Sequence, residues 1–428
     1  MLKREKTMVR LCVGVLASLF AISCVAQDFR DTFTSVTPGN FDSGGEISRQ
    51  FHLNAESYFT MATIARRTET RELTFAPDPA LARHAVSHNG VETSFAEYVS
   101  DDPLLDGVVV LHNEKIVFEA YPNMQPWQRH FAWSVTKVVT STALAMLVER
   151  GQVDMGAAVD NYVPALKDSA WAGIALRDIA NMASGIDCLD SDGYQDPTTC
   201  IYTMEESLGI TAPTGRKPDF IEHLQGMRAH RAAGTKNEYV SANTNVLMLV
   251  IEAVTGKPYA TALQELLWNP IGAEADALMA ISKSGYAYAS GGLHARLRDV
   301  ARFGQIYTQP ELSGALTRSM ISTIQGEGVA LSPDRLEESL GEDVPVRSGW
   351  QWDHIWADGA MYKAGYSGQG IYVDPARDLV VAWFGTGLNF EELVNGMLPV
   401  SRQIARSGLF GAITASDARG TRTARVWR

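Results

Sequence analysis

Two side chains that could perform acyl-transfer chemistry stand three residues apart, Ser134 and Lys137. Apolar side chains follow at helical spacing as far as Leu147, and Gly151 offers a stop, so we predict a helix that begins at Ser134. Three residues are almost one helical turn, and the hydroxyl and the amine therefore share a face. A lysine held in a closed pocket can lose its proton near neutral pH and activate a serine as nucleophile. The alternative is that Ser134 merely caps the helix.

Two later segments carry further residues of the kinds that catalysis uses. Residues 233–245 contain Tyr239 and lead into an apolar helical run. Residues 363–375 read Lys-Ala-Gly-Tyr-Ser-Gly-Gln-Gly-Ile-Tyr-Val-Asp-Pro and lead into an apolar strand. In this order with residues 134–137, they make the chain resemble the penicillin-recognising serine hydrolases over roughly residues 95 to 405. That family includes class C β-lactamases, D,D-peptidases, several esterases and 6-aminohexanoate-dimer (nylon-oligomer) hydrolases.

The resemblance implies a serine hydrolase that works through an acyl-enzyme. Ser134 would be the nucleophile, Lys137 its base, and Tyr239 the relay of a proton between serine, lysine and leaving group. A tyrosine between cations can have a lowered pKa, which would suit that relay. The backbone N–H groups of Ser134 and Tyr366 would form the oxyanion hole, and Gly365 would let a ligand approach the backbone closely. A buried aromatic residue and a flexible turn are the alternatives for Tyr239 and for the glycine-rich stretch.

Two positions depart from the β-lactamase pattern. Ser241 stands where class C β-lactamases carry asparagine, and Asn243 lies two residues further along. Ala364 replaces the hydroxyl of the usual Lys-Thr-Gly or Lys-Ser-Gly, which helps to bind the β-lactam carboxylate. Nylon-oligomer hydrolases and related esterases tolerate such changes, so the resemblance favours a small-molecule ester or linear amide as substrate. A β-lactamase or D,D-peptidase is the alternative enzyme, and a non-catalytic ligand-binding relative is the alternative of another class.

Three further residues are candidates for the wall of the pocket. Tyr194 occupies the loop that in nylon-oligomer hydrolases carries a substrate-closing tyrosine, with a plain surface loop as the alternative. Tyr288 and Ser241 are expected to contact the substrate. His294 is expected to be structural, because the three motifs already supply the proton transfers.

The N-terminus indicates export. Four basic residues within the first ten precede the uncharged run from Leu11 to Ile22, and Cys24-Val25-Ala26 offers a small-residue cleavage site. These features predict a signal peptide over residues 1–26 and a periplasmic or secreted product. The alternative is a lipoprotein acylated at Cys24.

Charge and cysteine usage agree with an exported enzyme. The full chain carries −12, and residues 1–26 carry four basic and one acidic side chain, so the mature chain would carry −15. This disfavours nucleic acid and anionic membrane surfaces as partners, and no later segment predicts stable membrane insertion. Cys188 and Cys200 lie twelve residues apart, which in an oxidising compartment favours a disulfide over two free thiols. No Cys/His spacing suggests zinc, and the motifs imply no metal or cofactor. The sequence carries no signal for an oligomeric state.

Hydrophobic residues make up 46% of the chain, enough for a large core. Residues 107–112 with 115–120 predict one hairpin, and residues 371–373 with 379–384 predict a second. Helices are predicted over 134–150, 176–183, 244–254, 259–267, 298–307 and 390–409. The resemblance implies an α/β fold of the β-lactamase/D,D-peptidase type, with a central antiparallel sheet flanked by helices and a mainly helical insertion. The expected organisation is a leader segment over 27–95, a hydrolase domain over 96–410 and a tail over 411–428.

Overall fold

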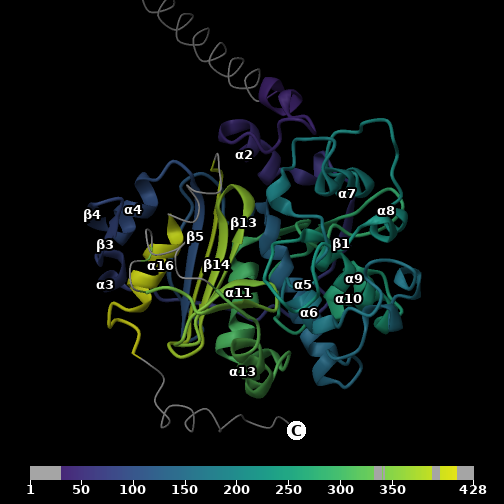
Figure 1. Ribbon diagram of the computed structural model, residues 1–428. Coiled ribbons are helices and arrows are strands. Elements are labelled where there is room, and N and C mark those ends of the chain that lie inside the picture. The colour runs from purple at the N-terminus through teal and green to yellow at the C-terminus, as the bar shows by residue number, and fades with distance from the viewer. Residues whose placement is uncertain (1–29, 332–339, 341–342, 388–395, 412–428) are drawn as a thin grey trace, which may run out of the picture.

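The computed structural model describes residues 30–331, 340, 343–387 and 396–411 (Figure 1). The expected signal peptide, the first residues of the helix expected over 390–409, and the tail from residue 412 lie outside the described residues.

A nine-stranded sheet forms the centre of the molecule, and both predicted hairpins belong to it. They are β5 (Leu105–His112) with β6 (Lys115–Ala120), and β14 (Gln369–Asp374) with β15 (Leu379–Gly385). β15 pairs antiparallel with β5, so the two hairpins, from opposite ends of the chain, join in one antiparallel sheet of the kind that the resemblance implies. The strand order is β10-β11-β12-β13-β14-β15-β5-β6-β2. The remaining strands are β2 (Thr74–Phe75), β10 (Val329–Ala330), β11 (Arg347–Gly349), β12 (Trp352–Ile355) and β13 (Met361–Gly365).

Alternating side chains bury both faces of this sheet. In β15, Val380, Ala382 and Phe384 point to the larger core, which includes α11 (Leu297–Thr308), whereas Val381 and Trp383 point to a second core. The second core is closed by α4 (Phe95–Asp101) and α16 (Met397–Ala405) (Figure 1). Helices therefore flank both faces, as the fold prediction requires.

The helical insertion lies beside the sheet (Figure 1). Its helices are α5 (Thr136–Glu149), α6 (Leu176–Ala180), α7 (Cys200–Leu208), α8 (Phe220–Gly226), α9 (Ser241–Thr255) and α10 (Tyr259–Leu263). α10 continues as a π-helical turn, η6, over Gln264–Trp268. α5 and α9 pack against each other and are buried along most of their length, because both are apolar on nearly every side. Shorter helices α12 (Pro310–Ser313) and α13 (Arg318–Gly326) follow α11.

No single helix among the described residues is long and apolar enough to cross a membrane. α9 and the α10–η6 segment pass that test only as a pair, which is bent by 76°.

The segment expected as an N-terminal leader is built into the fold from residue 30 onwards. β1 (Met61–Ile64) joins a second sheet of order β1-β8-β9-β7, in which β7 is Arg129–Phe131, β8 is Ala277–Ala280 and β9 is Leu293–Arg296. α2 (Gly45–Leu53) packs on β7. The short helix α3 (Pro79–Ala82) and the hairpin of β3 (Ala85–His88) and β4 (Val91–Ser94) complete the segment.

Candidate active site

Ser134 and Lys137 lie in hydrogen-bond contact. Ser134 sits in a short 3₁₀ turn, η2 (Trp133–Val135), and Lys137 lies in the first turn of α5. Lys137 Nζ donates to Ser134 Oγ at 2.9 Å and to the backbone oxygen of Ser290 at 2.8 Å. Val135 occupies the N-cap position of α5, so the structure does not support the capping alternative for Ser134.

The environment of Lys137 favours its neutral form. Only 1% of the residue is exposed, and burial lowers the pKa of Lys137 to about 7. The Lys363 cation lowers this pKa further, whereas Asp190 and Asp353 oppose the shift. A neutral Nζ can accept the proton of the serine hydroxyl, which a charged ammonium cannot do.

This pKa predicts the pH dependence of the reaction. If Lys137 acts as the base, activity requires its neutral form, and kcat/KM should rise with pH to an inflection near 7 and level off above it. Asp190→Asn removes a charge that raises the Lys137 pKa, and should therefore move the inflection to lower pH. Rates for an uncharged ester from pH 5 to 9 measure both curves. An inflection that stayed fixed or moved upward in Asp190→Asn would contradict the assignment.

Tyr239 lies between the two lysines, just before α9. Its hydroxyl accepts a hydrogen bond from Lys363 Nζ at 3.0 Å and is hydrogen-bonded to Ser134. The Nζ atoms of Lys137 and Lys363 lie 5.0 and 4.9 Å from the centre of its ring. Lys363 Nζ also contacts both carboxylate oxygens of Asp353 at 2.8 Å. Tyr239 thus lies between the amines of Lys137 and Lys363, as a tyrosine flanked by cations.

The expected lowering of the Tyr239 pKa was wrong. Burial raises the pKa of Tyr239 well above its ordinary value, and the carboxylates of Asp353 and Asp190 add to the rise. Desolvation of the phenolate outweighs the attraction of the lysines, one of which is paired with Asp353. Tyr239 is therefore a phenol at neutral pH, which suits a proton donor.

The strand that carries the third motif ends against the turn of Ser134. A side chain on Gly365 could not fit, because its Cβ would lie 2.7 Å from the backbone oxygen of Ala132. The glycine thus permits a close approach between two parts of the protein, and the expected approach of a ligand stays a prediction. Tyr366 follows in η8 (Tyr366–Gly368), and its ring meets the Trp133 ring edge-on at 5.8 Å. This contact places the Tyr366 segment beside the turn that holds Ser134.

Asp190 binds two of the residues expected to contact substrate. It lies in η5 (Asp190–Asp192) and accepts hydrogen bonds from the hydroxyls of Tyr194 and Ser241. It also accepts the Ser241 backbone N–H at 2.7 Å. Ser241 is buried, and its hydroxyl is engaged by the Asp190 carboxylate. The Tyr194 ring lies 6.2 Å from that of Tyr366, which places Tyr194 at the site. Asn243 is fully buried.

A second buried carboxylate, Glu205 on α7, holds Tyr288. The Tyr288 hydroxyl donates to Glu205 Oε1 at 2.6 Å, and each residue is 4% exposed. Burial raises the pKa of Glu205 to about 8, although the hydrogen bond from Tyr288 and the charge of Lys137 oppose this rise. No signal in the sequence points to Asp190, Glu205 or Asp353, because they come from separate segments without a common motif.

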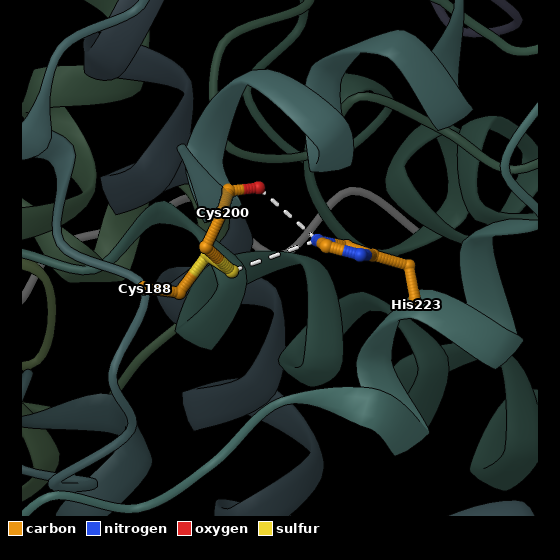
Figure 2. A group of neighbouring side chains, drawn as sticks. All are labelled: Cys188, Cys200 and His223. Atoms are coloured by element: carbon orange, nitrogen blue, oxygen red, sulfur yellow. Dashed lines mark hydrogen bonds between the residues drawn. A yellow bond between two sulfur atoms is a disulfide. The ribbon is translucent and has the colours of Figure 1, made fainter. Parts of the chain in front are cut away.

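The predicted disulfide between Cys188 and Cys200 is confirmed, with an S–S distance of 2.08 Å (Figure 2). It joins the chain just before η5 to the first residue of α7, and so closes the loop that carries Asp190 and Tyr194. His223 Nε2 lies 3.6 Å from Cys200 Sγ and 3.1 Å from the Cys200 carbonyl oxygen (Figure 2). Both sulfurs belong to the disulfide, so these three residues do not form a thiolate metal site.

Comparisons with known proteins give relatives of the whole fold. Residues 104–405 match a family model described as Beta-lactamase. The chain is 27% identical over 288 residues to a 6-aminohexanoate-dimer hydrolase of Paenarthrobacter ureafaciens, an alignment that covers 66% of this chain and 72% of that protein. A structure from Bacillus anthracis assigned as a 6-aminohexanoate-dimer hydrolase has a TM-score of 0.72 and 22% identity, over 87% of this chain and 95% of that one. EstCE1, a hydrolase with promiscuous acyltransferase activity, has a TM-score of 0.54 and 15% identity, over 73% and 95% of the two chains. The Bacillus anthracis structure and EstCE1 share the fold of this chain.

Proposed function

This chain belongs to the beta-lactamase family, and we propose that within this family of serine hydrolases it cleaves carboxylic esters or linear amides through an acyl-enzyme on Ser134. The observation that carries the proposal is the 2.9 Å hydrogen bond between Lys137 and Ser134, with the pKa of Lys137 at about 7. A nucleophile in contact with a neutral base is the arrangement that acyl transfer needs, and a binding protein has no use for it. The similarity to the Paenarthrobacter hydrolase supports the substrate class.

In the first step, Ser134 Oγ attacks the carbonyl carbon and its proton passes to Lys137 Nζ. The electron pair of the C=O bond moves to the oxygen, which the backbone N–H groups of Ser134 and Tyr366 would stabilise. When the bond to the leaving group breaks, the leaving atom takes the phenolic proton of Tyr239, and Tyr239 recovers a proton from the Lys137 ammonium. Water then repeats the sequence on the ester of Ser134, releases the acid and returns the serine proton.

The surroundings of Lys363 argue against a β-lactam carboxylate. Ala364 offers no hydroxyl, and its backbone N–H already donates to Asp353 Oδ2 at 2.9 Å. The positive charge of Lys363 is engaged by the same carboxylate. With Asp190 also nearby, an anionic substrate would meet negative charge and no unpaired cation among these residues. A neutral or cationic ester or amide fits better, and a β-lactamase or D,D-peptidase remains the second candidate because of the family itself.

The charges around Lys363 predict a substrate preference. The purified enzyme should hydrolyse p-nitrophenyl acetate or butyrate with a kcat/KM at least roughly a hundredfold above that for nitrocefin, because the latter leaves its carboxylate unpaired. Initial rates with both chromogenic substrates measure the ratio, and Ser134→Ala supplies the background for each. A larger kcat/KM for nitrocefin than for every ester and linear amide tried would favour the β-lactamase.

We also propose that the protein is exported from the cytoplasm. A disulfide of this kind persists in oxidising compartments, which supports a periplasmic or secreted location after removal of residues 1–26. N-terminal sequencing of the mature protein tests the cleavage after Ala26, and an acylated Cys24 would reveal the lipoprotein instead.

A further inference from the structure

A cluster of buried polar side chains lies behind the nucleophile and plays no part in the steps above. Asp106 of β5 accepts hydrogen bonds from Arg49 Nε at 2.7 Å and from Thr386, and its Oδ2 lies 3.0 Å from His130 Nε2. The ring of His52, from α2, lies tilted beside that of His130, with ring centres 4.8 Å apart. The two histidines, Asp106 and Thr386 are fully buried. Burying such a cluster is costly unless its polar groups are hydrogen-bonded to one another.

The hydrogen bonds of this cluster form a chain in which each group donates to the next, and the first donor is Trp133, the residue before Ser134. The indole N–H of Trp133 can only donate, and it lies 2.8 Å from His52 Nε2, which must therefore be the unprotonated nitrogen. The imidazole proton is then on Nδ1, 3.5 Å from Thr386 Oγ1, and Thr386 donates in turn to Asp106. His52 Nε2 accepts the indole proton and His52 Nδ1 carries its own proton, so His52 has no free lone pair for a metal ion in the group that it forms with Asp106 and His130.

Trp133 needs such support because its backbone is strained. Its φ is +45°, in the left-handed region that a bulky side chain rarely adopts. A conformation of this kind persists only when its surroundings fix it. The ring of Trp133 stacks on that of Phe41, with ring centres 5.7 Å apart, and meets Tyr366 edge-on. The hydrogen bond to His52 holds the indole N–H. The peptide that leaves this residue carries the N–H and the Cα of Ser134.

We propose that His52 is a positioning residue for the nucleophile. By accepting the indole N–H, it holds Trp133 in its left-handed conformation, so that Ser134 Oγ faces Lys137 and the Ser134 N–H lies beside the Tyr366 segment. The N-terminal segment that the sequence left unassigned thus takes part in building the active site. The inference rests on the proposed function, because it concerns the same serine.

His52→Phe tests the role, and His52→Gln is its matched control. Phenylalanine keeps a flat ring of similar size but accepts no hydrogen bond, whereas the glutamine oxygen can take the place of Nε2. Since a misplacement of about 1 Å can cost roughly a hundredfold, kcat for an ester should fall about ten- to a hundredfold in His52→Phe, with KM within about twofold. The glutamine variant should recover most of the loss. The inflection near pH 7 should stay in place, because Lys137 is untouched. A folded His52→Phe with kcat within about twofold of wild type would overturn the proposal.

Trp133→Phe removes the donor from the other side of the same hydrogen bond. If His52 acts through the indole, adding His52→Phe to Trp133→Phe should cost no more than about twofold beyond the single change. Full additivity of the two losses would overturn the proposal. Should His52→Phe not fold, Trp133→Phe decides by itself, since the proposal requires it to lose about tenfold in kcat.

A signal that needs no substrate separates this inference from the proposed function. The Trp133 indole N–H, identified in the NMR spectrum by its loss in Trp133→Phe, should exchange slowly with solvent in wild type and His52→Gln, and faster in His52→Phe. If wild type cleaves no ester or amide while this signal behaves as expected, the proposed function fails and the support of Trp133 by His52 stands. If wild type is active and the signal does not respond to His52→Phe, the positioning role fails.

Discussion

Ser134→Ala is expected to lower kcat/KM for p-nitrophenyl butyrate by about three orders of magnitude or more, and to abolish labelling by a fluorophosphonate. The reason is geometric: the proposed base donates its hydrogen bond to this hydroxyl, and removal of Oγ leaves Lys137 without a group to deprotonate. Intact-protein mass spectrometry counts the labels, and initial rates give the activity. The substitution removes one oxygen atom, so the circular dichroism spectrum should not change.

Ser322→Ala is the matched control for this experiment. Ser322 is an exposed serine on α13, whose hydroxyl bonds to the Arg318 backbone oxygen, and its loss should change neither labelling nor rate. Labelling that persisted at another serine in Ser134→Ala would contradict the assignment of the nucleophile.

The local parts of the fold could be predicted because short-range patterns encode them. Short apolar runs on either side of a turn indicated β5, β6, β14 and β15, and helical spacing indicated α5, α9, α10 and α11. The pairing of β15 with β5 had no local signal and followed from the resemblance alone. The pairing of β1 with β8 had neither kind of signal, which is why residues 27–95 remained an unassigned leader. The helix expected over 176–183 ends at Ala180, because Met182 turns to a φ of +54°.

In the candidate site, too, contacts between residues near in sequence could be predicted and long-range effects could not. Ser134 and Lys137 stand three residues apart at the start of a predicted helix, so their contact could be predicted from the sequence, although Ser134 lies in the 3₁₀ turn before α5. The pKa of Tyr239 was not, because its direction depends on burial and on Asp353, which reaches the site from another strand. The sequence included Lys363 in a motif but gave it no role, since its bond to Tyr239 joins residues far apart in the chain. Tertiary structure thus determined the charge balance of the site.

Tyr239→Phe should affect substrates according to their leaving group. A phenol with a raised pKa supplies a proton but does not readily exist as phenolate, so its loss should matter most when the leaving atom must be protonated. We expect kcat/KM to fall about 10²- to 10⁴-fold for an alkyl amide, and at most about tenfold for the p-nitrophenyl ester of the same acid. The p-nitrophenolate departs without a proton, so the pair of substrates isolates the acid step.

Tyr162→Phe serves as the control for this experiment, because the Tyr162 hydroxyl accepts the backbone N–H of Asp154 and contacts none of the residues assigned to catalysis. Equal losses for the amide and the ester in Tyr239→Phe would show that Tyr239 orients Ser134 rather than protonating the leaving group. A larger loss for the amide, with the inflection near pH 7 retained, would assign the base to Lys137 and the acid to Tyr239. The two groups then differ in role because burial acts oppositely on them: it removes the proton from the amine and keeps the proton on the phenol.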